Sequence, residues 1–358
     1  MDERVRRIVM KPADTVGEAL RRMDATGGRM VIVAAPDDML LGVATDGDMR
    51  RWIIAGRSLD APLSDAMNRH PHVLERGFAR RDAERLMVEG RFECLPVVDG
   101  DGHLTDAIWW HDLIEGAPAA RRAALGVPVV VMAGGRGTRL APYTNVLPKA
   151  LVPIGDTPIA QLIMERFVEW GCDEFFLMLE HKAALVRAYF GDLDVPYRVR
   201  SVVEPRPLGT AGALSLLAGQ ITETFFLTNC DVLVDADYES ILRTHRESGN
   251  DITLVASIKR FTIPYGVCDV AEDGRLTTIA EKPSFDHLVS TGLYVVEPGV
   301  LDDVPRDTPR DMTDLIGGCL ERGRPLGVYP VSEGAWLDMG ELDPLRDMIE
   351  RLGSAERR

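Results

Sequence analysis

The chain has 358 residues, enough for two or three domains, and 46% of them are hydrophobic, so each domain can bury a core. Its formal net charge of −15 and pI of about 5.0 argue against nucleic acid or an anionic membrane surface as a main partner. The five cysteines form no CxxC pair, which argues against a disulfide framework or a zinc site. No apolar run approaches the ~20 residues of a membrane span, and the charged start is unlike a secretory signal. We therefore expect a soluble cytoplasmic protein.

Residues 1–118 contain two segments that share one plan, about 1–58 and 62–118. Each has an extended lead-in, an amphipathic helix, a strand, a turn, a second strand and a short helix, judged by the spacing of apolar residues. One such unit buries little surface alone, so the duplication predicts that the two units pack on each other.

These repeats resemble a tandem pair of CBS domains, an α+β Bateman module. In that family a Thr and an Asp of a GxxTxxD-like segment contact the phosphate and ribose of adenine nucleotides, and the first repeat has them as Thr45 and Asp48 after Gly42. The second repeat keeps only Asp112 and has Trp109 in place of the Thr. The resemblance implies a regulatory adenine nucleotide at Thr45 and Asp48. The alternative is a packing or dimerisation module without a ligand.

Residues 119–127 belong to a small, polar, proline-bounded stretch that is typical of a linker. From residue 128 to residue 358 apolar strands alternate with helical stretches, which predicts an α/β domain with a mostly parallel, Rossmann-like sheet. Strands are expected at 129–132, 174–179, 198–203 and 224–228, and helices at 159–170, 183–190 and 210–217. In such sheets ligands bind at the carboxyl ends of the strands.

The stretch VVVMAGGRGTRLAPYTNVLPK, residues 129–149, has the composition of a phosphate-binding loop at the end of a buried strand. Its glycines allow positive φ and close approach of backbone N–H groups to phosphate, and its cations supply charge. The glycines are Gly134, Gly135 and Gly137, and the cations are Arg136, Arg139 and Lys149. The spacing matches neither GxxxxGK[ST] nor GxGxxG. A plain glycine turn with solvated arginines is the alternative.

Further candidates follow in chain order. Asp231 comes directly after an apolar strand, a common place for a Mg²⁺ ligand, although a turn or helix cap also explains it. The segment 204–214 places glycines between a strand and a helix, with Thr210 as the expected helix N-cap. The segments IPYGV, EKP and STGLYV are also consistent with strand edges, turns or a surface ion pair, and WLDMG follows them near the end of the chain.

Together these segments resemble the signature of sugar-1-phosphate nucleotidyltransferases, whose catalytic domain has a GT-A-like fold. The resemblance implies that nucleotide is bound by Ala133, Gly134, Gly135, Gly137, Thr138, Glu204, Gly209 and Thr210. It assigns the sugar phosphate to Gly266, Glu281, Lys282 and Gly292, and the cofactor Mg²⁺ to Asp231 and Asp338. Arg139 would hold the β and γ phosphates, Lys149 would stabilise charge at the α phosphate, and Lys282 would position the sugar phosphate.

The CBS pair with PYGV, EKP and WLDMG looks most like the glucosamine-1-phosphate guanylyltransferases of legionaminic acid (nonulosonate) biosynthesis, which use GTP. Relatives that use mannose 1-phosphate or heptose 1-phosphate, or UTP or dTTP, share the loop motifs and remain alternatives. A different class is an adenine-nucleotide sensor whose transferase fold is inactive. The joint presence of Arg139, Lys149, Asp231, Lys282 and Asp338 argues against it. CBS pairs commonly associate, so we expect a homodimer.

Overall fold

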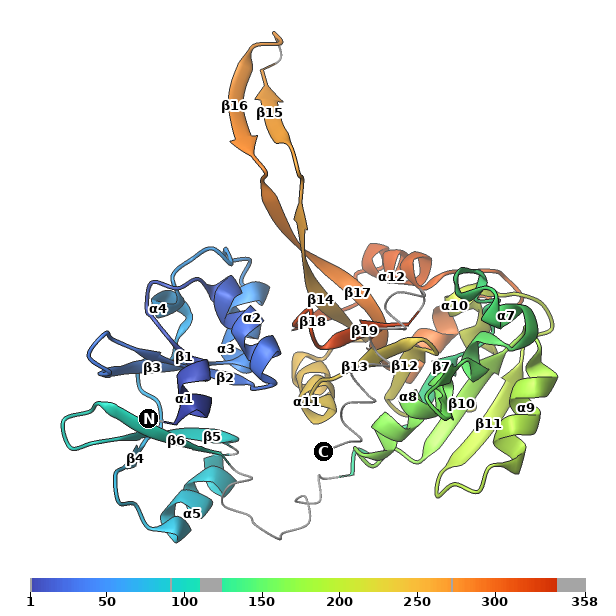
Figure 1. The fold of residues 1–358 in the computed structure, drawn as a ribbon. Helices are drawn as coiled ribbons and strands as arrows, with labels where there is room; N and C mark the ends of the chain where they lie inside the picture. Colours follow the sequence, from blue (N-terminus) through green and yellow to red (C-terminus); the bar gives the residue numbers. More distant parts are fainter. Residues whose placement is uncertain (1, 91, 110–123, 272, 340–358) are drawn as a thin grey trace. The chain divides into compact units, whose positions relative to one another are not determined.

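The structure is a computed structural model that describes residues 2–90, 92–109, 124–271 and 273–339. These residues divide into two compact units (Figure 1). The first unit contains the described residues up to 109 with 258–287 and 332–334, and the second contains 124–257, 288–331 and 335–339. Asp112 and the first half of the expected linker lie outside the described residues. Among the described helices, none combines the length and apolar character that crossing a membrane requires.

The first unit begins with two copies of one arrangement. The first copy comprises α1 (Glu3–Ile8), β1 (Val9–Met10), α2 (Val16–Thr26), β2 (Met30–Ala34), β3 (Leu40–Thr45) and α3 (Asp46–Ile54). After α4 (Leu63–Ala66), the second copy comprises β4 (Leu74–Glu75), α5 (Arg80–Gly90), β5 (Cys94–Val98) and β6 (Leu104–Trp109). Each copy forms a three-stranded sheet, in the orders β1-β2-β3 and β4-β5-β6.

The two copies are joined by reciprocal backbone hydrogen bonds at the turns of their hairpins. Leu40 N–H donates to the carbonyl of Gly102 at 3.1 Å, and Leu104 N–H donates to the carbonyl of Asp38 at 2.8 Å. Both hairpins also carry a register shift at the same point, one residue pair before the turn. The copies therefore pack on each other with approximate internal symmetry, as the duplication predicts.

An antiparallel ribbon, β15 (Gly266–Val270) with β16 (Leu276–Glu281), also belongs to the first unit. All six residues of β16 are exposed. The apolar side chains Val270, Leu276 and Ile279 are 65%, 59% and 66% exposed. The chain enters the ribbon from β14 (Ile252–Thr262), which begins in the second unit, and leaves it through β17 (Ser284–Val296), which ends in the second unit.

The second unit contains a seven-stranded sheet in the order β11-β10-β7-β12-β17-β14-β18. Its other strands are β7 (Val129–Met132), β10 (Glu174–Leu179), β11 (Arg198–Val203), β12 (Phe225–Asn229) and β18 (Leu326–Val331). Short pairs are β8 (Pro153–Ile154) with β9 (Thr157–Pro158) and β13 (Val232–Val234) with β19 (Trp336–Asp338). The α-helices are α7 (Tyr143–Val146), α8 (Ile159–Val168), α9 (Ala183–Asp192), α10 (Gly209–Gly212), α11 (Tyr238–Ser248) and α12 (Met312–Glu321). The 3₁₀ turns are η1 (Thr138–Leu140), η2 (Lys149–Leu151), η3 (Ala213–Leu217) and η4 (Pro298–Asp303).

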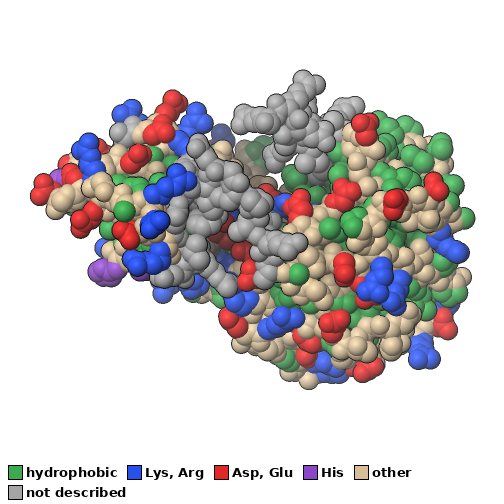
Figure 2. Space-filling view, turned by 90° about the horizontal axis from the view of Figure 1, so that it is seen from below, with side chains coloured by type: hydrophobic (Ala, Val, Ile, Leu, Met, Phe, Trp, Pro, Cys, Tyr) green, Lys and Arg blue, Asp and Glu red, His purple; other side chains and the backbone are tan. Residues whose placement is uncertain are grey.

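The strands β11, β10, β7 and β12 are mutually parallel, whereas β17 runs antiparallel to β12. Along β7 the side chains of Val129 and Val131 join one buried cluster with α8, α9 and α11, and Val130 joins a second cluster with α10 and α12. Helices therefore cover both faces, which explains why these strands are uninterrupted apolar runs. The expected α/β class with a mostly parallel sheet is confirmed. On the face of this unit shown in Figure 2, acidic and basic side chains are interspersed.

Candidate active site

The glycine loop begins at the carboxyl end of β7, between β10 and β12. Ala133 N–H donates to the carbonyl of Met178 at 2.9 Å, and His181 N–H donates to the carbonyl of Gly134 at 3.3 Å. These bonds fix the start of the loop against the end of β10. The loop then leaves the sheet, and Thr138 and Arg139 lie exposed on η1.

Two of the three glycines are required by packing. A Cβ at Gly134 would lie 2.8 Å from Glu204 Oε1, and a Cβ at Gly137, whose φ is +63°, would lie 2.8 Å from Thr144 Cγ2. Any side chain at either position would force its neighbour to move. A Cβ at Gly135 would have no described atom within 4 Å, so the space beside it is open. The loop thus combines two close approaches with one exposed, unobstructed backbone segment.

Lys149, at the start of η2, forms an ion pair with Asp231, which follows β12. The two side chains are only 15% and 8% exposed. Asp338 is brought to the same place because β19 pairs with β13, with Asp338 opposite Val232, and because Met339 N–H donates to the carbonyl of Asp231 at 2.8 Å. The structure therefore gathers Lys149, Asp231 and Asp338 at one edge of the sheet.

Two carboxylates on paired strands suit a hard divalent cation, since Mg²⁺ prefers oxygen ligands and keeps several waters. Gly292 lies against Asn229, at the end of β12: its φ is +87°, and a Cβ there would stand 2.5 Å from Asn229 Nδ2. The residues present thus fit the predicted metal. Among the described residues, a tighter cluster of metal-type ligands lies elsewhere, in the first unit, at Asp99, Asp101 and His103.

Glu204 follows β11 and is 8% exposed. Its Oε2 accepts the N–H of Leu208 at 2.9 Å, and its Oε1 faces Gly134. Burial raises the pKa of this carboxyl and nearby Glu180 adds to the effect, while the Leu208 hydrogen bond opposes it. Glu204 is therefore a largely buried acceptor directly against the glycine loop.

The segment after Glu204 packs on the residues before α12. Gly209 has φ +75°, and a Cβ there would lie 2.6 Å from the carbonyl oxygen of Arg310. That oxygen accepts the N–H groups of Ala211 and Gly212 at 2.9 and 3.0 Å. The expected N-cap role of Thr210 is wrong, because its hydroxyl accepts the N–H of Met312 at 3.0 Å instead. Thr210 thus satisfies the first turn of α12, a partner 102 residues away.

Three sugar-side residues lie in the first unit. Gly266 is paired with Glu281 in the ribbon, and a Cβ at Gly266 would lie 3.3 Å from Glu281 Oε2. Lys282 has φ +47°, and its N–H donates to the carbonyl of Tyr265 at 3.3 Å. Glu281 and Lys282 are exposed. Their assignment to the sugar phosphate stays a prediction, as does that of Gly292 in the second unit.

Thr45 and Asp48 bind each other and cap α3. Asp48 Oδ2 accepts the N–H of Thr45 at 2.8 Å and its hydroxyl at 2.6 Å, and Arg51 pairs with Asp48 Oδ1 at 2.5 Å. A Cβ at Gly42 would lie 2.5 Å from the carbonyl oxygen of Asn68. The GxxTxxD-like segment therefore has a local structural role here. Its predicted nucleotide role stays a prediction.

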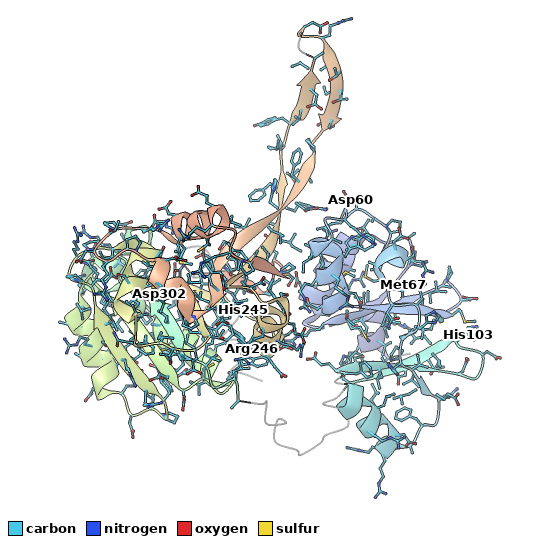
Figure 3. The ribbon with its side chains drawn as sticks, turned by 180° about the vertical axis from the view of Figure 1, so that it is seen from behind. Asp60, Met67, His103, His245, Arg246 and Asp302 are labelled. Carbon is cyan, nitrogen blue, oxygen red and sulfur yellow. The ribbon has the colours of Figure 1, made fainter. Side chains whose placement is uncertain are left out.

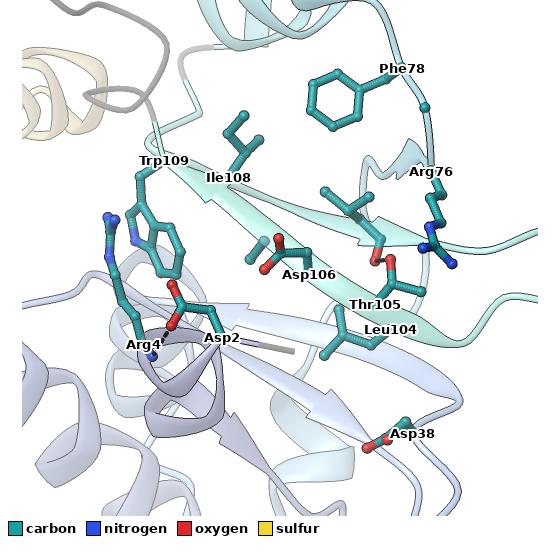
Figure 4. Close-up of a pocket in the computed structure, with 13 residues that line it drawn as sticks. Asp2, Arg4, Asp38, Arg76, Phe78, Leu104, Thr105, Asp106, Ile108 and Trp109 are labelled. Atoms are coloured by element: carbon teal, nitrogen blue, oxygen red, sulfur yellow. Dashed lines mark hydrogen bonds between the residues drawn. The ribbon is translucent and has the colours of Figure 1, made fainter.

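A cavity of about 740 Å³ is lined by residues of both repeats (Figure 4). Its aromatic and charged lining side chains include Arg4, Arg76, Phe78, Asp106 and Trp109. The guanidinium of Arg4 lies 3.6 Å from the centre of a Trp109 ring. The lining thus includes Trp109, which stands in the second repeat in place of the Thr of the GxxTxxD pattern.

Sequence reasoning missed Glu180 and Lys182, which follow β10 directly. Glu180 Cβ would lie 3.3 Å from a Cβ on Gly134, and Lys182 Nζ donates to three carbonyls of residues 144–146. The available signal was their position at the carboxyl end of a predicted strand next to the loop strand, together with their polar character.

Comparison with known families fits this geometry. The family model described as Nucleotidyl transferase matches residues 128–354, and the model described as CBS domain matches residues 5–55 and 63–108. The chain therefore belongs to the nucleotidyl transferase family.

Among curated relatives, the chain is 28% identical over 248 residues to a UTP–glucose-1-phosphate uridylyltransferase of Synechocystis sp., spanning 63% of each protein. It is 31% identical over 222 residues to a mannose-1-phosphate guanylyltransferase of Mycobacterium tuberculosis, spanning 60% of this chain and 61% of that protein. The chain thus matches about three fifths of the length of these relatives. HddC from Yersinia pseudotuberculosis shares the fold, with a TM-score of 0.51 at 23% identity, over 63% of this chain and 99% of that one.

Proposed function

We propose that this protein transfers a nucleotidyl group from a nucleoside triphosphate to a sugar 1-phosphate. A phosphate oxygen of the sugar attacks the α phosphorus, the bond to the β phosphate breaks, and pyrophosphate leaves. The observation that carries the proposal is the Lys149–Asp231 pair with Asp338 beside it, at the sheet edge where the glycine loop begins. Membership of the family supports it.

The chain's own residues supply orientation and charge, and the attacking phosphate is already ionised, so no general base is required. The amides of residues 135–138 and Arg139 hold the β and γ phosphates. Lys149 stabilises the charge that develops at the α phosphate, and Lys282 positions the sugar phosphate. Mg²⁺, held by Asp231 and Asp338, neutralises phosphate charge when bound.

For the base we propose guanine, because of the chemistry of Glu204. Its largely buried carboxylate faces the glycine loop and accepts hydrogen bonds. Guanine offers two neighbouring donors, N1–H and the N2 amino group, whereas uracil and thymine offer one N–H between two carbonyls that a carboxylate repels. For the sugar we propose glucosamine 1-phosphate, in a pathway of nonulosonate glycan synthesis, on the motif resemblance alone.

Pyrophosphate release by the full chain with Mg²⁺ tests the proposal. The nucleoside triphosphates GTP, UTP, dTTP, CTP and ATP are each paired with the 1-phosphates of glucosamine, mannose, glucose and heptose. We expect the highest kcat/KM with GTP and glucosamine 1-phosphate. The variant Glu204→Gln should lower the GTP-to-UTP preference about 10-fold or more, because an amide pairs with uracil. Exposed Glu223→Gln is the matched control. Preference for UTP in the wild type would contradict the base assignment.

A second candidate function rests on the cavity that residues of both repeats line. We propose that it binds an adenine nucleotide, with Phe78 or Trp109 against the base and Arg4 and Arg76 toward the phosphates. Calorimetric titration with AMP, ADP and ATP tests this. Arg76→Ala should abolish binding that Thr45→Val leaves intact, and exposed Arg85→Ala is the control. If Thr45→Val loses binding and Arg76→Ala does not, the nucleotide binds at Thr45 in the first repeat and not in the cavity. Tight binding without any pyrophosphate release would favour the sensor function.

A further inference from the structure

Lys182 has an unusual backbone conformation, and its ammonium group donates all of its hydrogen bonds to one turn. It precedes α9 with φ +53°, a conformation that L side chains other than Asn and Asp seldom adopt. Its ammonium donates to the carbonyl oxygens of Thr144, Asn145 and Val146 at 3.1, 2.9 and 2.9 Å. An ammonium has three N–H donors, so all of them are used.

The three acceptors are carbonyls at the end of α7, the short helix between the glycine loop and Lys149. Carbonyls at a helix end have no partner within the helix and carry partial negative charge, so a cation there stabilises the turn. A helix of four residues has little stability of its own. Lys182 therefore supplies the hydrogen-bond donors and the positive charge that stabilise the end of α7.

This turn is bonded directly to the glycine loop. Thr144 donates its hydroxyl to the carbonyl of Gly137 at 2.8 Å, and its methyl group fills the space beside Gly137 that a side chain would need. The residue before Lys182, His181, donates its N–H to the carbonyl of Gly134 at 3.3 Å. The pair 181–182 thus contacts the loop at its first glycine through the backbone, and at its last glycine through Lys182 and Thr144.

We propose that Lys182 is a positioning residue that holds the glycine loop in its phosphate-binding shape before the nucleotide arrives, acting through Thr144. The inference rests on the proposed function for the identity of the ligand. The strained backbone at Lys182 is kept because it aims the ammonium at the three carbonyls. Lys182 does not itself touch a substrate in this assignment.

The variant Lys182→Gly isolates the ammonium, because glycine accepts positive φ without strain. Hydrogen–deuterium exchange of the full chain without substrates is the first readout. Amides of residues 135–146 should exchange about 10-fold faster than in the wild type, while the core strands stay unchanged. The exposed Arg187→Met, on the helix that Lys182 precedes, removes an equal charge and should leave exchange unaltered. Unchanged exchange in the loop, or a uniform rise across the whole unit, overturns the proposal.

Steady-state kinetics give the second readout. Lys182→Gly should raise the KM for the nucleotide about 10-fold and leave the KM for the sugar phosphate within about two-fold, since a misplaced loop affects one substrate. Added methylammonium should lower the KM of Lys182→Gly for the nucleotide part of the way back to the wild-type value. The separate variant Lys182→Arg should also have a raised KM for the nucleotide, because a planar guanidinium cannot donate to three converging carbonyls. An unchanged nucleotide KM overturns the proposal. Failure of the proposed function shows separately, as absence of turnover in the wild type, and leaves the exchange readout valid.

Discussion

Lys149 and Asp231 are each other's counter-ion in a region with little water. Their side chains are 15% and 8% exposed, so neither charge is solvated well enough to stand alone. A pair of this kind contributes modestly as a unit, but removing one member leaves an uncompensated charge. The pair therefore couples the stability of the fold to the proposed chemistry at a single point.

We expect Lys149→Met to lower turnover about 10²- to 10³-fold, because a preorganised charge stabiliser is lost. It should also lower the free energy of unfolding by about 3–5 kcal/mol, since Asp231 is left unpaired. The double variant Lys149→Met with Asp231→Asn should recover most of that stability in urea denaturation and none of the turnover. Near-normal turnover of purified Lys149→Met would refute the role assigned to the ammonium.

His245 lies fully buried on α11 (Figure 3). Its Nδ1 is 2.8 Å from the hydroxyl of Thr253, and its Nε2 is 3.0 Å from a carboxylate oxygen of Glu297. Burial lowers the pKa of His245 from the ordinary value near 6.5, and Arg246 adds to this, while Glu297 and Asp251 oppose it. The folded protein therefore favours the neutral ring.

A lowered pKa in the folded state means that the unfolded chain binds more protons below about pH 6.5. The stabilising contribution of His245 is complete above that pH and is lost as the pH falls toward the folded-state pKa. We expect the free energy of unfolding to drop between pH 7.5 and 5.5 on this account. The variant His245→Gln should lack that part of the pH dependence. Parallel pH profiles of the two proteins would show that His245 is not responsible.

At the scale of elements, four strands of the seven-stranded sheet match their predictions, and one helix does not. The runs at 129–132 and 174–179 are buried on both faces, so their sequences are continuously apolar and match β7 and β10. The stretch 210–217 looks helical, but the chain forms the short α10 and then η3. Gly209 and Gly212 press against the backbone of residues 308–310, a contact far away in sequence that local patterns do not encode.

The contact of Gly209 with residues 308–310 predicts that replacing Gly209 by Ala destabilises the protein more than the same change at Gly219, a glycine with a similar φ. Gly209 and Gly219 have φ of +75° and +78°, but only Gly209 is crowded, and a Cβ at Gly219 has no described atom within 4 Å. Gly219→Ala should cost about 1 kcal/mol from backbone strain. Gly209→Ala should cost about 1–3 kcal/mol more, from overpacking against Arg310. Equal costs in urea denaturation would mean that the approach of residues 308–310 is not as tight as described.

At the scale of the whole molecule, the sequence predicts that the two residues assigned to the metal lie together, but it does not predict where the residues assigned to the sugar lie. Asp231 and Asp338 each follow or end a strand, so sheet pairing brings them together. Lys182 was missed because its hydrogen bonds depend on a turn that no periodicity reveals. The ribbon carries Glu281 and Lys282 in the other compact unit, and sequence patterns say nothing about how units are arranged.

Lys282 offers a test that separates function from folding. Because its φ is +47° and it is exposed, Lys282→Gly keeps the backbone unstrained and removes only the cation. We expect the KM for the sugar 1-phosphate to rise about 10-fold or more with no loss of thermal stability. Exposed Arg275→Gly, in the same ribbon, serves as the control. If the KM for the sugar phosphate is unaltered, the cation that holds this phosphate lies elsewhere.

The central position of β7 has a consequence for how such enzymes diversify. The loop strand has β10 and β11 on one side, which lead into Glu180 and Glu204, and β12 and β17 on the other, which carry Asp231 and Gly292. In the proposed function these are the base side and the metal and sugar side. Substitutions on one side of β7 can then change the specificity for one substrate, while the phosphate loop and the residues on the other side stay the same. Relatives of about equal similarity to this chain carry the names of a uridylyltransferase for glucose 1-phosphate and a guanylyltransferase for mannose 1-phosphate, as such independent drift would produce.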